Sequence, residues 1–219
     1  RRGYEADLSR AMAKFDAGDL AGAVRSLQAM RKARPRDATI LNNLGAALHG
    51  SGDAEGAIEV LHASIRFNPS HAPSHITLAG VWLAEGSLDR ASAFAEKAIE
   101  LQPAMAPARE QAGRIAMASG RMEDAAGHLQ AAVQIGSIDP SVRELLGIAL
   151  LDLNENSDAL QHFEITLRTD PDRPASIGGM AMAMARLGRR AEALQILAAA
   201  QQRFPGHPAL SQAASLIGG

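Results

Sequence analysis

The sequence contains no cysteine, so disulfides, thiol chemistry and cysteine-ligated zinc sites are excluded. Aromatic residues make up only 3% of the 219 residues, and β-branched residues are scattered, which argues against a sheet protein. There is no run of about 18 apolar residues, so we expect no membrane insertion. Lysine and arginine number 22 against 24 acidic residues, and without a basic stripe no nucleic-acid partner is expected.

What the chain has in quantity is alanine, together with leucine, isoleucine and methionine, within an apolar fraction of 47%. Alanine has the highest helix propensity and lets helices approach closely, so this composition predicts a soluble all-α protein. An alanine-rich, cysteine-free composition favours a bacterial source and fits the cytoplasm and the periplasm equally. The chain begins Arg1-Arg2-Gly3, without Met or an apolar signal segment, so we interpret its start as processed or trimmed and leave open a longer natural protein.

A repeat of 34 residues runs through the chain without a gap. The expected units are 4–37, 38–71, 72–105, 106–139, 140–173 and 174–207, and residues 208–217 are expected to form a capping helix. Position 20 of every unit is alanine: Ala23, Ala57, Ala91, Ala125, Ala159 and Ala193. Position 8 is always small: Ala11, Gly45, Ala79, Gly113, Gly147 and Ala181. We expect these two positions to lie where the two helices of a unit cross, since larger side chains would force them apart.

Two further positions mark where helices end. Position 15 holds the residue types that best tolerate a positive φ: Gly18, Gly52, Gly86, Gly120, Asn154 and Gly188. Position 32 is proline in five units, Pro35, Pro69, Pro103, Pro171 and Pro205, and Ser137 in the other. Each unit therefore predicts a helix, a tight turn and a second helix that proline ends.

These residues resemble the tetratricopeptide repeat (TPR) family over almost the whole chain. The unit 38–71 carries the signature clearly, with Leu41, Leu44, Gly45, Leu48, Gly52, Ala57, Leu61 and Pro69. The resemblance implies a right-handed α-solenoid of six helix-turn-helix hairpins plus a C-terminal capping helix, as one domain over 4–219. Asp7 and Arg10 stand where core residues belong, so we expect them at the exposed start of the stack rather than in a site.

The resemblance also implies that the first helix of each hairpin lines a concave groove that binds a peptide. The groove is unusually apolar around a polar centre, and methionine in it favours tolerant binding. Its expected residues are Leu8, Met12, Phe15, Asn42, Asn43, His49, Ile76, Thr77, Gly80, Leu83, Gln111, Arg114, Met117, Leu145, Ile148 and Met182. Leu151 is expected to add apolar surface, and Gly178 and Gly179, like Gly80, to let a partner backbone approach closely. The alternatives are that self-association or tight curvature covers this surface, or that partners use the convex face.

No catalytic, cofactor or metal site is predicted, and the chain is not expected to be an enzyme. His71 and His75 are four residues apart, but no carboxylate accompanies them at metal-ligand spacing, so they are expected to be turn and surface residues. The pair Gly178-Gly179 falls inside an expected helix and not after a strand, so it is no phosphate loop.

The predicted function is that of a non-catalytic scaffold or adaptor that binds another protein or a peptide segment. A second possibility is the recognition arm of a larger bacterial enzyme, such as a glycosyltransferase or sulfotransferase, or of a secretion or polysaccharide-export assembly. A third is self-association through an open end of the stack. Because Arg114 is the only cation at positions 5, 6 and 9 and Glu110 and Glu144 lie nearby, we expect no tight binding of acidic C-terminal tails.

Overall fold

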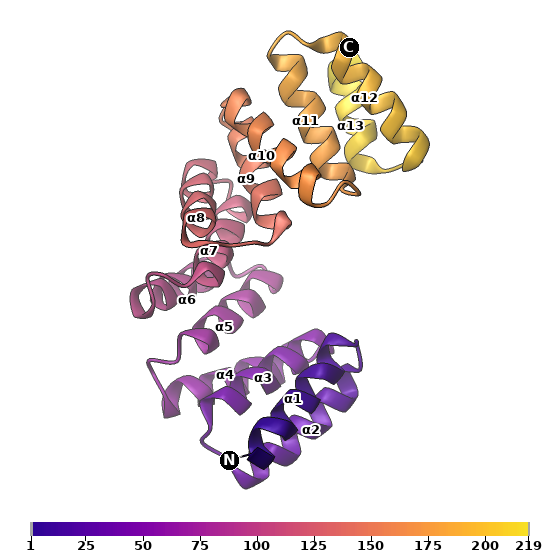
Figure 1. The fold of residues 1–219 in the computed structure, drawn as a ribbon. Helices are drawn as coiled ribbons and strands as arrows, with labels where there is room; N and C mark the ends of the chain where they lie inside the picture. The colour runs from indigo at the N-terminus through magenta and orange to yellow at the C-terminus, as the bar shows by residue number, and fades with distance from the viewer. Residues whose placement is uncertain (1, 219) are drawn as a thin grey trace. The chain divides into compact units, whose positions relative to one another are not determined.

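The computed structural model describes residues 2–218, and within that range the fold consists of α-helices without a strand (Figure 1). The predicted all-α fold is confirmed. None of the described helices is both long and apolar enough to cross a membrane. The helices are α1 Arg2–Asp16, α2 Leu20–Ala33, α3 Ala38–Gly50, α4 Ala54–Phe67, α5 Ala72–Ala84, α6 Leu88–Leu101, α7 Ala106–Ala118, α8 Met122–Ile135, α9 Pro140–Asp152, α10 Asn156–Thr169, α11 Pro174–Arg186, α12 Arg190–Arg203 and α13 Pro208–Gly218.

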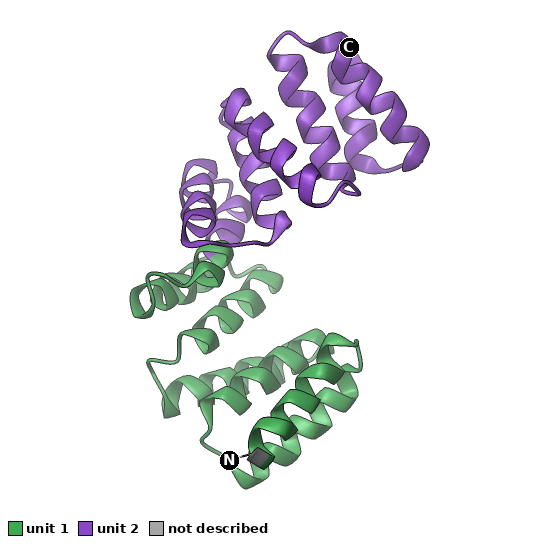
Figure 2. Cartoon of the chain, viewed as in Figure 1, with its two compact units in different colours: residues 1–111 green, residues 112–219 purple. Residues whose placement is uncertain are grey.

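The helices form two compact units, residues 1–111 (unit 1) and residues 112–219 (unit 2), and the boundary falls within α7 (Figure 2). In unit 1 the second helices α2 and α4 contact the first helix of the next hairpin, α2 with α3 and α4 with α5. First helices also contact one another, α1 with α3 and α3 with α5. Unit 2 repeats this arrangement with α8, α9, α10 and α11. The single domain over 4–219 stays a prediction.

The turn inside each hairpin has the predicted left-handed residue. Position 15 has a positive φ in every unit, between 62° at Asn154 and 88° at Gly52. Around Gly52 the amide of Asp53 donates to the carbonyl of Leu48 at 2.9 Å, and the same bond recurs from Glu155 to Leu150. This is the Schellman arrangement, which satisfies carbonyl groups that a helix end leaves free.

The second helix of one hairpin, α8, ends differently from the second helices of the others. In the unit 106–139, which has Ser137 in place of proline, α8 ends at Ile135 and Gly136 caps it with φ 113° and ψ 25°. The amide of Ser137 then donates to the carbonyl of Ala132 at 3.0 Å. A left-handed glycine therefore replaces proline as the signal that stops this helix, and the repeat pattern did not predict this.

The crossing of the two helices in each hairpin requires the small residues at position 8. A Cβ built on Gly45 would lie 2.5 Å from the Leu61 side chain, and one on Gly113 would lie 2.6 Å from Leu129. The same Cβ on Gly113 would lie 3.5 Å from the backbone oxygen of Ala125, so positions 8 and 20 meet as predicted. The leucines sit fully buried over these glycines, and each contributes about 1.5–3 kcal/mol of hydrophobic stabilisation.

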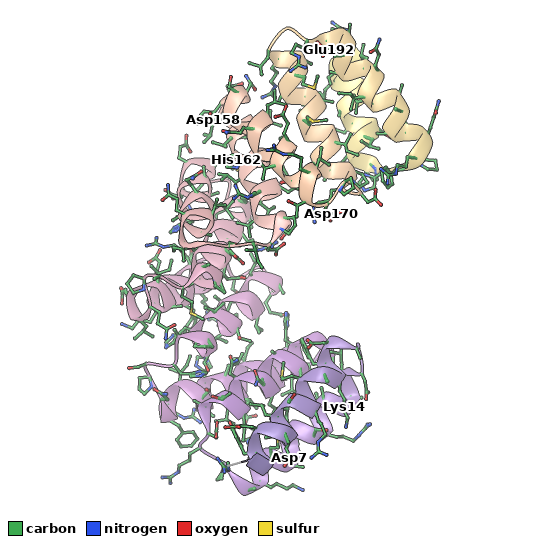
Figure 3. All side chains as sticks on the ribbon, viewed as in Figure 1. Asp7, Lys14, Asp158, His162, Asp170 and Glu192 are labelled. Carbon is green, nitrogen blue, oxygen red and sulfur yellow. The ribbon has the colours of Figure 1, made fainter. Side chains whose placement is uncertain are left out.

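The ends of the chain also match their predictions. Asp7 and Arg10 are exposed and pair with each other on the surface of α1, where Figure 3 labels Asp7. At the other end α13 contacts α11 and α12 and buries Leu210, Ala213 and Ile217. The last helix therefore covers the apolar side of the hairpin formed by α11 and α12.

Candidate peptide-binding surface

The predicted binding residues lie on the first helices of the hairpins. All of them are partly exposed: each has one side on the protein interior and another open to solvent. In unit 1 this first-helix surface consists of Leu8, Met12, Phe15, Asn42, Asn43, His49, Ile76, Thr77, Gly80, Leu83 and Gln111. In unit 2 it consists of Arg114, Met117, Leu145, Ile148 and Met182.

The apolar side chains of the unit 1 surface are held in place by the core beneath them. Leu8 and Phe15 pack against the large buried cluster that includes Leu41, Leu44 and Leu48. Ile76 packs against a smaller alanine cluster contributed by α5, α6 and α7. Because the buried part of each side chain is fixed, the exposed part is an ordered apolar surface.

A polar group lies across α3 and α5 in the same surface. The Thr77 hydroxyl lies 2.9 Å from Asn42 Oδ1 and 3.0 Å from the carbonyl of Pro73, both acceptors for its hydrogen. Asn42 Nδ2 in turn donates to Asn43 Oδ1 at 3.4 Å. Within residues 2–218 no hydrogen bond engages Asn43 Nδ2 or the Gln111 amide, so these two groups are the ones free to bind a partner backbone.

In unit 2 the polar part of the surface is already engaged. Arg114 Nη2 donates to Ser141 Oγ at 3.1 Å, and that hydroxyl donates to Asp139 Oδ2 at 2.7 Å. The hydrogen bond from Ser141 is the main reason that the pKa of Asp139 lies below its usual value. The guanidinium of Arg114 is therefore already hydrogen-bonded within its own chain.

Sequence reasoning missed an arginine that changes the charge of this surface. Arg173 donates two hydrogen bonds to Glu144, from Nη2 at 2.9 Å and from Nε at 3.1 Å, and Ser176 donates a third. Burial alone would raise the pKa of Glu144, but these bonds outweigh it and lower that pKa. The repeat positions assigned to the groove do not include Arg173, because it is the last residue of its repeat. The sequence feature that could have indicated it is a cation directly before the helix that begins at Pro174.

Three residues expected to be open to a partner are closed. Leu151 is only 6% exposed. A Cβ on Gly178 would lie 3.1 Å from the backbone oxygen of Ala209 at the start of α13, and one on Gly179 would lie 2.4 Å from the Phe163 ring. These glycines are small because the capping helix and a buried aromatic approach them, so the prediction that a partner backbone contacts them is wrong.

The histidine pair has structural partners. His71 Nδ1 lies 2.8 Å from Ser74 Oγ, and His75 Nε2 lies 3.0 Å from the carbonyl of Pro69. His75 is buried, so the expectation of a surface position is wrong for this residue. Among the described residues no group of three or more metal-ligating side chains comes together.

Acid should destabilise the fold through three half-buried histidines. Burial lowers the pKa of His62, His71 and His162, so the folded state disfavours the protonated form that the unfolded chain adopts below about pH 6.5. The free energy of unfolding should therefore be lower at about pH 5.5 than at about pH 7.5, as measured by urea denaturation. The double variant His62→Gln/His162→Gln should show a smaller difference. Equal stability of the natural chain at both pH values would contradict this.

Solved structures with the same fold are similar to most of the chain. YrrB, a TPR protein with an unusual peptide-binding site, is 20% identical with a TM-score of 0.73, over 86% of this chain and 97% of that one. PilF from Pseudomonas aeruginosa is 14% identical with a TM-score of 0.83, over 95% of each chain. TTC0263, a TPR protein from Thermus thermophilus, is 19% identical with a TM-score of 0.69, over 88% of this chain and 98% of that one. No curated protein matches the sequence.

Two family models, each described as tetratricopeptide repeat, match the sequence. One matches residues 8–72 and 75–140, and the other matches residues 150–217. The TPR fold supports a general role as a protein-interaction scaffold, and proteins built from it are generally non-catalytic and bind other proteins or peptides. With these matches covering most of its length, the chain belongs to the tetratricopeptide repeat family.

Proposed function

We propose that this protein is a non-catalytic scaffold that binds a peptide segment on the first-helix surface of unit 1. The observation that carries the proposal is the composition of that surface. It combines half-exposed Leu8, Met12, Phe15 and Leu83 with two polar groups that make no hydrogen bond within residues 2–218, Asn43 Nδ2 and the Gln111 amide. Exposed apolar side chains of this size, gathered on one surface, usually mark a contact site.

The chemistry of the surface favours an apolar segment with accessible backbone groups. The methionine and leucine side chains can adapt to aliphatic partners, and an amide side chain can donate to a peptide carbonyl and accept from a peptide amide. Gly80 gives room beside Gln111, because a Cβ there would lie 3.7 Å from Gln111 Nε2, an ordinary contact. The description of YrrB as a TPR protein with a peptide-binding site supports the same use of the fold.

The proposal is tested by selecting peptides from a random phage-displayed library against the natural chain and measuring their affinity by fluorescence anisotropy. Met12→Glu and Leu83→Glu should each weaken binding by about 30-fold or more, roughly 2 kcal/mol, because a carboxylate would be desolvated at the contact. The matched control is Ala93→Glu, which adds the same charge at an exposed position of α6 and should bind as the natural chain does. Equal binding by both surface variants and the control would overturn the proposal.

A further inference from the structure

A hollow that is separate from the first-helix surface lies in unit 2 between α8, α9 and α10. Its volume is about 600 Å³. Buried Leu146 and Leu150 line it from the side of α9 opposite Leu145 and Ile148, and half-buried Leu153, directly after α9, continues this lining. Half-buried Val133 and Ile165 complete an apolar lining.

The rim of this hollow carries unbalanced negative charge. Glu123 from α8 and Glu155 and Asp158 from the start of α10 face it, against the single guanidinium of Arg143. Within the described part of the chain none of these three carboxylates makes an ion pair. Free carboxylates in such numbers make the hollow attractive to a cation.

The position that Glu155 occupies carries a cation in the two neighbouring repeats, whereas it carries Asp19 and Asp53 in the first two repeats of the chain. Arg121, directly before α8, pairs with Asp124 at 3.0 Å, and Arg189, directly before α12, pairs with Glu192 at 2.8 Å. In the repeat between them the arginine is replaced by Glu155, three residues before Asp158. The local partner of Asp158 is therefore missing, and a second carboxylate stands in its place.

A glycine keeps the hollow open. Gly127 lies inside α8, and a Cβ built there would meet no atom within 4 Å. Glycine inside a helix costs about 0.5–1 kcal/mol relative to alanine, and no contact of the fold requires it here. The same position in the other repeats carries Arg25, Glu59, Ala93, Gln161 and Gln195, and the four longer side chains would extend into the space that Gly127 leaves.

The histidine that lines the hollow does not neutralise the carboxylates. Asp158 and His162 both lie on α10 (Figure 3), and His162 lines the hollow. Burial, with a smaller contribution from Arg143, lowers the pKa of His162. Its ring is therefore neutral at neutral pH, and the net charge of the rim stays negative.

We propose that this hollow docks a basic segment of a partner protein, with a lysine or arginine against Glu155 and Asp158 and aliphatic neighbours against Val133, Leu153 and Ile165. The hollow has the two chemistries that such a segment needs, an apolar lining and a free anionic rim. It is a second binding site, in unit 2, whereas the peptide surface proposed above lies in unit 1.

The test uses the full chain and a fluorescein-labelled peptide of alternating lysine and leucine, with a glutamate-leucine peptide as the charge-reversed probe. Fluorescence anisotropy should show at least tenfold preference for the lysine peptide, declining as salt rises. Glu155→Arg, which recreates the pair seen at Arg121, and Gly127→Gln, which fills the hollow, should each reduce that affinity about tenfold or more. Ala93→Glu and Leu83→Glu, both outside the hollow, should leave it unchanged.

Circular dichroism should show natural helix content in all four variants, and if Glu155→Arg fails to fold, Gly127→Gln still decides the matter. Equal affinity for the two peptides, or natural affinity in both Glu155→Arg and Gly127→Gln, would overturn the proposal. Loss of binding in Leu83→Glu would also overturn it, because the peptide would then occupy the first-helix surface of unit 1.

Discussion

Replacing Phe163 with alanine should lower the free energy of unfolding by about 3–5 kcal/mol, the usual range for a buried phenylalanine. The ring is fully buried in unit 2. It lies against two glycines, because a Cβ on Gly147 would be 2.8 Å from the ring and one on Gly179 would be 2.4 Å from it. Glycines have no side chains that could move into the space left by the ring, so we expect a loss near the upper end of the range.

Urea denaturation followed by helical circular dichroism measures this loss. The matched control is Phe67→Ala, because Phe67 is 46% exposed and the guanidinium carbon of Arg36 lies 5.7 Å from the centre of its ring. The control should change stability by about 1 kcal/mol or less. Similar losses in the two variants would contradict the central position of Phe163 in the packing of unit 2.

The same substitution, glycine to alanine, should have opposite effects at two helical positions of unit 2. Gly179→Ala places a methyl group within 2.4 Å of the Phe163 ring, and we expect a loss of about 1–3 kcal/mol from overpacking. Gly127→Ala places its methyl group in open space, and we expect a gain of about 0.5–1 kcal/mol from helix propensity.

A third variant tests the cause of the loss at Gly179. If the clash with the ring is responsible, the effects of Gly179→Ala and Phe163→Leu on the free energy of unfolding should be less than additive in the double variant, because the smaller side chain makes room for the methyl group. Additive effects, or a stabilising Gly179→Ala, would show that the ring is not the limiting contact.

Local rules of helix formation explain why so much of the fold was predictable. The helices that begin at Ala38, Ala72, Pro140 and Pro174 do so at the predicted starts of their repeats. Turn geometry depends on one residue with a positive φ, and a repeating sequence shows that residue several times over. The exception, Gly136, escaped notice because it ends one helix only and so has no equivalent in the repeat.

The location of the candidate surface followed from the same repeat, but its chemistry did not. The repeat predicts that a partner backbone can approach Gly178 and Gly179 closely, although α13 and Phe163 fill the space beside them. Glu144 was read as a free repelling charge, although Arg173 neutralises it. Both errors have the same cause. The spacing of residues within one hairpin does not predict which side chains of the next hairpin they contact.

By itself the sequence determined the helical hairpins, their turns and the small residues where helices cross, because each of these depends on residues a few positions apart. Only the tertiary structure decided which polar groups are left for a partner. The bond from Thr77 to Asn42 spans 35 residues and the pair of Arg173 with Glu144 spans 29, so each joins one repeat to the next. Such pairs depend on how far two side chains reach across packed helices, and that distance exists only once the hairpins have stacked.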